Sequence, residues 1–213
     1  RWRRLHDRPR AGDRPLTGLF TELLAHPGVE ERSSLRSTTG VMAYHGGNLE
    51  VGTDLIAEAV ADRVGASSYV VTQPEPLRWH LPSKAFVPDE SPCLAEFLAH
   101  VDRVVTIHGY GRRSMFTTVL LGGRNRPLAA RIATNLRAAL PGYEVIDDLD
   151  AIPKPLRGVH AQNPVNVPPE HGVQIELPPR VRGNGPFWNG WDGGWPTPHT
   201  EDLIDGLAAA LHG

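Results

Sequence analysis

The sequence contains almost no cysteine. Cys93 is the only cysteine among the 213 residues, so the chain can form no internal disulfide. A single thiol also excludes a zinc site built from cysteines. The fold must therefore depend on its apolar core, and 40% hydrophobic residues are enough for a sizeable one.

Long hydrophobic runs and a strong net charge are also missing. No apolar stretch approaches the roughly 18 residues that a membrane-spanning helix needs. The basic start is not followed by the apolar segment of a secretory signal, so we expect a cytoplasmic protein, or one whose leader has been removed. The formal net charge of −2 gives no indication of binding to nucleic acid or to a membrane.

Positive charge is concentrated at the amino end. The first fourteen residues contain six arginines against Asp7 and Asp13. We expect residues 1–15 to form a flexible basic leader. The alternative is an arm that contacts a polyanion, and a steep salt dependence of that binding would test it. Residues 16–213 have the length of a single domain.

Short apolar runs alternate with amphipathic segments along this domain, and no internal repeat is visible. Leucine or isoleucine recurs every four residues from Leu128 to Leu140, a pattern that predicts a helix with Pro127 in its first turn. Thr53 and Thr200 are expected to cap two other helices. The predicted helices are 16–27, 54–64, 93–101, 127–140 and one after residue 200, and the predicted strands are 40–43, 68–72, 103–107, 116–121, 143–146 and 172–175, with 28–37 as an edge strand or loop.

This alternation predicts an α/β domain whose mixed, mostly parallel sheet carries helices on both faces. Sheets of this kind bind ligands beyond the carboxyl ends of their strands. The residues that follow the predicted strands are therefore the candidates for a functional site.

The segment 44–53 follows one of these strands and has the composition of a metal-binding loop. His45 stands at the strand end and Glu50 at the start of the next helix. Gly46 and Gly47 between them allow a tight turn and leave room for a ligand. Zinc in hydrolases commonly takes two histidines and one glutamate and keeps one position open for water. His45 and Glu50 are thus candidate ligands, although a turn histidine and a carboxylate at a helix start would have the same spacing.

Two further predicted strands end in residues of the same chemistry. His108 supplies a second candidate histidine, and a core or surface histidine is the alternative. Glu176 follows an apolar strand, where a carboxylate needs a partner or a chemical task. It is either a general base that takes a proton from water on the metal and returns it to the leaving amine, or a salt-bridge partner of Arg180 or Arg182.

Other residues are candidates for binding the substrate or orienting the ligands. A guanidinium group pairs bidentately with a carboxylate, so an arginine should hold the substrate. Asn163 either holds its own loop by side-chain hydrogen bonds or orients the substrate. Asp54 and backbone carbonyls are candidates to orient the histidine rings. The arginine candidates, between which the sequence does not choose, are Arg112, Arg113, Arg124 and Arg182.

Several of these motifs occur in an order that resembles one family. They are His45-Gly46-Gly47 with Glu50-Val51-Gly52-Thr53, Ile107-His108-Gly109, Gly122-Gly123-Arg124-Asn125, Asn163 with Asn166, and Gly172-Val173-Gln174-Ile175-Glu176-Leu177. Over roughly residues 38–182 the sequence is similar to the phage-type poly-γ-glutamate hydrolase family. The resemblance implies a zinc carboxypeptidase-like fold and cleavage of γ-glutamyl amide bonds. It also implies one zinc ion held by His45, Glu50 and His108, with Glu176 as the catalytic glutamate.

We therefore expect a zinc-dependent amidohydrolase whose partner is a small or polymeric γ-glutamyl substrate. An amidase or carboxypeptidase for another acyl-amino acid or a cell-wall peptide is one alternative. A non-catalytic binding module on the same fold is another, and it would be favoured if the motif residues had been replaced. His45, Glu50, His108 and Glu176 are all present, which favours the enzyme.

Overall fold

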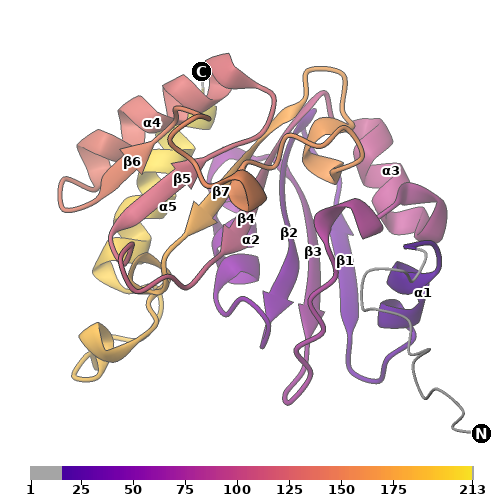
Figure 1. Cartoon of the computed structure of the whole chain (residues 1–213), viewed down its shortest axis with the longest axis horizontal. Coiled ribbons are helices and arrows are strands. Elements are labelled where there is room, and N and C mark those ends of the chain that lie inside the picture. Colours follow the sequence, from indigo (N-terminus) through magenta and orange to yellow (C-terminus); the bar gives the residue numbers. More distant parts are fainter. Residues whose placement is uncertain (1–15, 213) are drawn as a thin grey trace, which may run out of the picture.

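A mixed β-sheet runs through the centre of the molecule (Figure 1). The computed structural model describes residues 16–212, and within them the sheet has seven strands in the order β1-β3-β2-β4-β7-β5-β6. The pairs β2–β3, β2–β4, β4–β7 and β5–β6 are parallel, whereas β1–β3 and β5–β7 are antiparallel. The strands are β1 (Glu30–Ser34), β2 (Thr39–Gly47), β3 (Ser67–Gln73), β4 (Arg103–Gly109), β5 (Thr118–Leu121), β6 (Glu144–Ile146) and β7 (Gly172–Leu177).

Helices cover both faces of this sheet, as the alternation of elements predicts (Figure 1). On one face, helices α2, α4 and α5 bury apolar side chains against Val41, Val105 and Ile175 of the central strands. On the other face, α1, α3 and the loop after β3 pack against Met42 and Tyr69. No helix within residues 16–212 is long and apolar enough to cross a membrane. The helices are α1 (Leu19–Leu24), α2 (Thr53–Val64), α3 (Pro92–His100), α4 (Arg126–Ala139) and α5 (Pro198–Leu211).

The predicted fold class is confirmed, but two predicted helix caps are wrong. Helix α2 is preceded by Gly52 in a left-handed conformation with φ 87°, and Thr53 is its first residue. The Thr53 hydroxyl instead donates to the carbonyl of Glu50. Helix α5 already begins at Pro198, since proline is well tolerated in a first turn. The Thr200 hydroxyl donates to the carbonyl of Val181 and so contacts another segment rather than capping the helix. The predicted basic leader, residues 1–15, lies outside the described residues.

Strand β2 contains an irregularity that shapes the candidate site. Its parallel register with β3 shifts between Ala43 and Gly46, so that β2 has one extra residue there. In a regular strand two consecutive side chains point to opposite faces, but a bulge can turn both to one side. The rings of Tyr44 and His45 both contact Phe86, with centroids 4.5 and 5.3 Å away. The bulge therefore brings two consecutive polar rings onto the same face of the sheet.

Candidate active site

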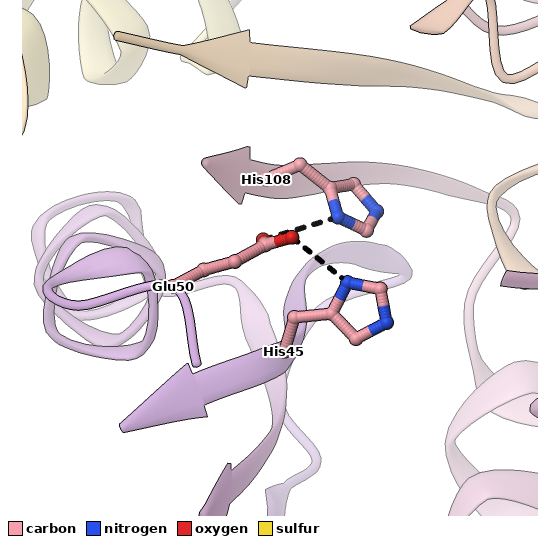
Figure 2. A group of neighbouring side chains, drawn as sticks. All are labelled: His45, Glu50 and His108. Carbon is pink, nitrogen blue, oxygen red and sulfur yellow. Dashed lines mark hydrogen bonds and ion pairs between the residues drawn. The ribbon is translucent and has the colours of Figure 1, made fainter. Parts of the chain in front are cut away.

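Three buried side chains from separate segments meet at the carboxyl ends of β2 and β4 (Figure 2). His45 belongs to β2, Glu50 to the turn before α2, and His108 to β4. Their exposed fractions are 1%, 8% and 3%. One ligand atom of each residue lies within 4.8 Å of the corresponding atoms of the other two, and within residues 16–212 no other group of His, Cys, Asp and Glu meets this criterion. The two histidines and the glutamate predicted from the sequence are thus brought together.

Both imidazole rings turn their Nδ1 atoms toward the Glu50 carboxylate (Figure 2). The Nδ1 atom of His45 lies 3.0 Å from Oε1, and that of His108 lies 3.3 Å from Oε2. The backbone N–H of Gly109 donates to Oε2 at 2.8 Å and fixes the carboxylate further. The three residues therefore form one rigid cluster around Glu50.

The Nε2 atoms of the two histidines determine where the ring protons are. His45 Nε2 lies 2.9 Å from the carbonyl oxygen of Leu81, which can only accept a hydrogen bond. The hydroxyl of Tyr44 donates to Asn163, so His108 Nε2, 3.0 Å from that hydroxyl, is the donor to it. In the neutral rings both Nδ1 atoms then carry lone pairs directed at a carboxylate. Three converging lone-pair donors form a set that a bound cation would stabilise, and two histidines with one glutamate suit zinc.

Burial and charge set the protonation of this cluster. Burial lowers the pKa of His45. Burial alone would also lower the pKa of His108, but the carboxylates of Glu50 and Glu176 raise it. Burial would raise the pKa of Glu50, yet the two histidines hold it well below its usual value. Glu50 is therefore ionised at neutral pH, as a metal-binding carboxylate must be.

Glu176 lies beside the cluster on the neighbouring strand. It is the register partner of His108 in the parallel pair β4–β7. Its side chain is buried, and burial raises its pKa to about 7. A carboxyl group with this pKa can take up and release a proton near neutral pH, which general acid–base catalysis requires. Among the described residues Glu176 forms no ion pair with Arg180 or Arg182, although the nearby charge of Arg182 partly offsets the rise in its pKa.

A chain of buried hydrogen bonds connects His108 to Glu176. Beyond the contact between His108 and Tyr44, the Tyr44 hydroxyl donates to Asn163 Oδ1 at 3.1 Å. Asn163 Nδ2 donates to Gln174 Oε1, and Gln174 Nε2 donates to Glu176 Oε1, each at 2.8 Å. This network fixes the orientation of one candidate ligand and of the candidate base together.

Tyr44 and Gln174 are members of this network that the sequence analysis missed. Gln174 stands two residues before Glu176 on a strand, so alternation alone places both side chains on one face, and this signal could have found it. Alternation would place the side chains of Tyr44 and His45 on opposite faces of the sheet, so it could not have found this pair. Only the bulge brings the two rings to one face. Of the two candidates to orient the rings, a backbone carbonyl is found at His45, whereas Asp54 Oδ1 accepts a hydrogen bond from the Gly47 backbone instead.

The structure separates the four candidate arginines. Arg112, Arg113 and Arg124 are exposed. Arg182 is 8% exposed and lies against Gly109, where a Cβ atom would stand 2.6 Å from its Cζ. Its charge interacts with Glu50 and Glu176, although burial lowers its pKa.

Arg182 also has unused hydrogen-bonding capacity. One guanidinium nitrogen donates to the carbonyl of Val51 at 2.6 Å, while Nε has no partner among the described residues. Asn163, by contrast, already bonds Tyr44, Val165 and Gln174 with its side chain.

Comparison with known proteins identifies the family. The family model described as poly-gamma-glutamate hydrolase matches residues 20–187, which is most of the chain. The chain belongs to this poly-γ-glutamate hydrolase family. A search of curated proteins gave no match. Family membership places the chain among hydrolases.

Solved structures share the fold of this family member. A bacteriophage poly-gamma-glutamate hydrolase superposes with a TM-score of 0.69 at 22% identity, covering 89% of this chain and 91% of its own. A structure named YNDL-apo (zinc-free) superposes with a TM-score of 0.67 at 21% identity, covering 86% of this chain and 89% of its own. A candidate carboxypeptidase from Burkholderia mallei superposes with a TM-score of 0.53 at 12% identity, covering 90% of this chain and 65% of its own. The expected carboxypeptidase-like architecture is therefore confirmed.

Proposed function

We propose that this member of the family is a zinc-dependent amidohydrolase that cleaves γ-glutamyl amide bonds of poly-γ-glutamate or a related polymer. One observation carries the proposal: the Nδ1 atoms of His45 and His108 and the carboxylate of Glu50 converge at the carboxyl edge of the sheet. The name of the related zinc-free structure, which implies a zinc-bound form of that protein, also supports it.

His45, Glu50 and His108 would hold the zinc ion. When bound, zinc polarises a scissile carbonyl and lowers the pKa of water toward about 7. The chain's own contribution is to hold the three ligand groups rigidly before the ion arrives. The Leu81 carbonyl and the Tyr44 hydroxyl do this by fixing the tautomers of the two rings.

Glu176 would carry the proton transfers. Its carboxylate accepts a proton from the attacking water and later donates it to the amine that leaves the cleaved amide. A pKa of about 7 suits both steps, because the group must change its protonation twice in each turnover. The hydrogen bond from Gln174 holds one oxygen in place and leaves the other oxygen for the reaction.

Arg182 is our choice for binding a substrate carboxylate near the reacting bond. Of the four candidates, it is the one whose charge interacts with Glu50 and Glu176. Arg112, Arg113 and Arg124 remain candidates for contacts further along a polymer, since their side chains are exposed. Asn163 would act indirectly, by positioning Tyr44 and Gln174.

Metal analysis combined with a digestion assay tests the proposed function. We expect one zinc per chain and release of fragments from γ-linked polyglutamate, but not from the α-linked polymer. Removal of zinc with a chelator should abolish digestion, and added zinc should restore it. Equal digestion of both polymers, or full activity without metal, would contradict the proposal.

The contact between Tyr44 and His108 gives a second prediction. Tyr44→Phe removes the hydroxyl that accepts from His108 Nε2, and losing such a partner typically weakens metal binding by about 10–100-fold. We expect the zinc Kd, measured by competition with a chromophoric chelator, to rise by about this factor. Tyr69→Phe is the matched control, because Tyr69 is also buried but donates to Glu31 instead. Unchanged zinc affinity in Tyr44→Phe would show that the hydroxyl does not position His108.

A further inference from the structure

Both lysines of the chain line one cavity. Lys84 and Lys154 are the only lysines in the sequence. Lys84 lies in the loop after β3, and Lys154 lies in the loop between β6 and β7. Between these loops is a cavity of about 320 Å³, which we call the lysine cavity. Its polar lining residues are Ser83, Lys84, Lys154, His160, Asn163 and Gln174.

The lysine cavity carries positive charge without a compensating anion. Among the described residues no Asp or Glu lines it, and neither lysine forms an ion pair. His160 Nδ1 accepts a hydrogen bond from the backbone of Gln162, so the proton of its neutral ring lies on Nε2. The cavity therefore offers two ammonium groups and one ring N–H to a ligand. Such a lining is suited to binding more than one carboxylate.

The lysine cavity adjoins the candidate active site. Gln174 lines it and also donates to Glu176 at 2.8 Å. Asn163 lines it and accepts from the hydroxyl of Tyr44 at 3.1 Å. The wall that carries Lys84 continues directly from Leu81, whose carbonyl holds His45. A polymer bound with one amide bond at Glu176 would therefore pass into the cavity with its neighbouring residues.

The chemistry of the polymer fits this lining. In poly-γ-glutamate the side-chain carboxyl forms the amide bond, so every residue keeps a free α-carboxylate. Lysine is a compact charge on a flexible stem and can follow such groups at several positions, whereas arginine prefers a fixed bidentate geometry. We propose that the lysine cavity is an anion subsite, in which Lys84, Lys154 and His160 bind α-carboxylates of substrate residues next to the scissile bond. This inference rests on the proposed hydrolase function.

Binding can be measured separately from cleavage. The zinc-loaded Glu176→Gln protein, in which turnover is suppressed, is titrated calorimetrically with a γ-linked glutamate hexamer. The same titration is then repeated with a protein that carries Lys84→Met and Lys154→Met in addition to Glu176→Gln. Both lysines are exposed, so methionine of similar length should leave the fold intact, and circular dichroism checks this. Arg36→Met is the matched control, because it removes a positive charge that is paired with Asp62 and does not line the cavity.

Exposed ion pairs each contribute up to a factor of about five in affinity, so the double lysine variant should bind the hexamer about 10-fold more weakly. The Arg36→Met variant should bind it normally. A hexamer with α-carboxamides in place of the carboxylates should bind weakly and with no dependence on the lysines. Equal binding of the acidic hexamer with and without the lysines would overturn the subsite.

A parallel digestion assay with the wild-type protein separates the two proposals. Digestion by the wild type together with lysine-independent binding would overturn the subsite and keep the hydrolase. Lysine-dependent binding without digestion would support carboxylate binding in the lysine cavity but overturn the hydrolase, and with it the placement of the cavity next to a scissile bond. Absence of both binding and digestion would overturn both.

Discussion

Replacing Glu176 by glutamine should leave zinc bound while turnover of γ-linked polyglutamate falls by about 10²–10⁴-fold. The amide keeps the size of the side chain, but it cannot accept a proton from water or return one to the leaving amine. Glu176 is not one of the three clustered ligand residues, so the metal content should not change. Plasma mass spectrometry measures the zinc bound per chain, and the rate at which the polymer is hydrolysed to fragments gives kcat. The effects on metal binding and on turnover are thus measured separately.

Glu170→Gln is the matched control for this substitution. Glu170 directly precedes His171 and β7, and its side chain lies 3.6 Å from Arg103 at the opposite end of the strand from Glu176. The same chemical change at this position should leave kcat within about twofold, as expected for a surface substitution. Near-normal hydrolysis by the zinc-loaded Glu176→Gln protein would exclude Glu176 as the base, even if the metal centre proved correct.

Replacing His45 by alanine should remove both the metal and the activity. A catalytic zinc usually has three protein ligands, and the loss of one leaves His108 and Glu50 as an incomplete set. The contribution of a bound metal to transition-state stabilisation is several kcal/mol, so activity should fall by more than about 10³-fold. Excess zinc should restore little of it. Equilibrium dialysis against buffered zinc and the digestion assay are the measurements.

His80→Ala is the control for a histidine that is close but is not a ligand. The ring centroid of His80 lies 4.7 Å from that of His45, yet His80 is exposed and is not part of the clustered set. We expect it to keep zinc and activity. Retention of tightly bound zinc by His45→Ala, with an unchanged melting profile, would show that the metal site has been assigned to the wrong residues.

The core of the candidate site could be predicted from the sequence for a simple geometric reason. Parallel strands place their carboxyl ends at one edge of a sheet, so His45, His108 and Glu176, each near such an end, had to approach one another. Glu50 could be predicted to join them because the glycine turn after His45 folds the chain back toward the same edge. The α/β architecture was predictable as well, since strand-like and helix-like periodicities alternate along the chain.

Other features depend on contacts between residues far apart in the sequence. Nothing local distinguishes Arg182 from Arg112, Arg113 and Arg124, and only its packing against Gly109 places it beside the carboxylates. The tertiary structure likewise decided that the Leu81 carbonyl and the Tyr44 hydroxyl orient the rings, where the sequence offered Asp54 or an unspecified backbone carbonyl.

What the sequence by itself determined is the set of reactive groups and the sheet edge at which they meet, because strand order and periodicity are local properties. What only the tertiary structure decided is how these groups are oriented and what surrounds them. The bulge in β2 brings His45 onto the face that already carries Met42 and Tyr44, and two loops bring Lys84 and Lys154 to one cavity. Loop packing and strand irregularities depend on contacts within the whole folded chain, so no periodicity in the sequence predicts them.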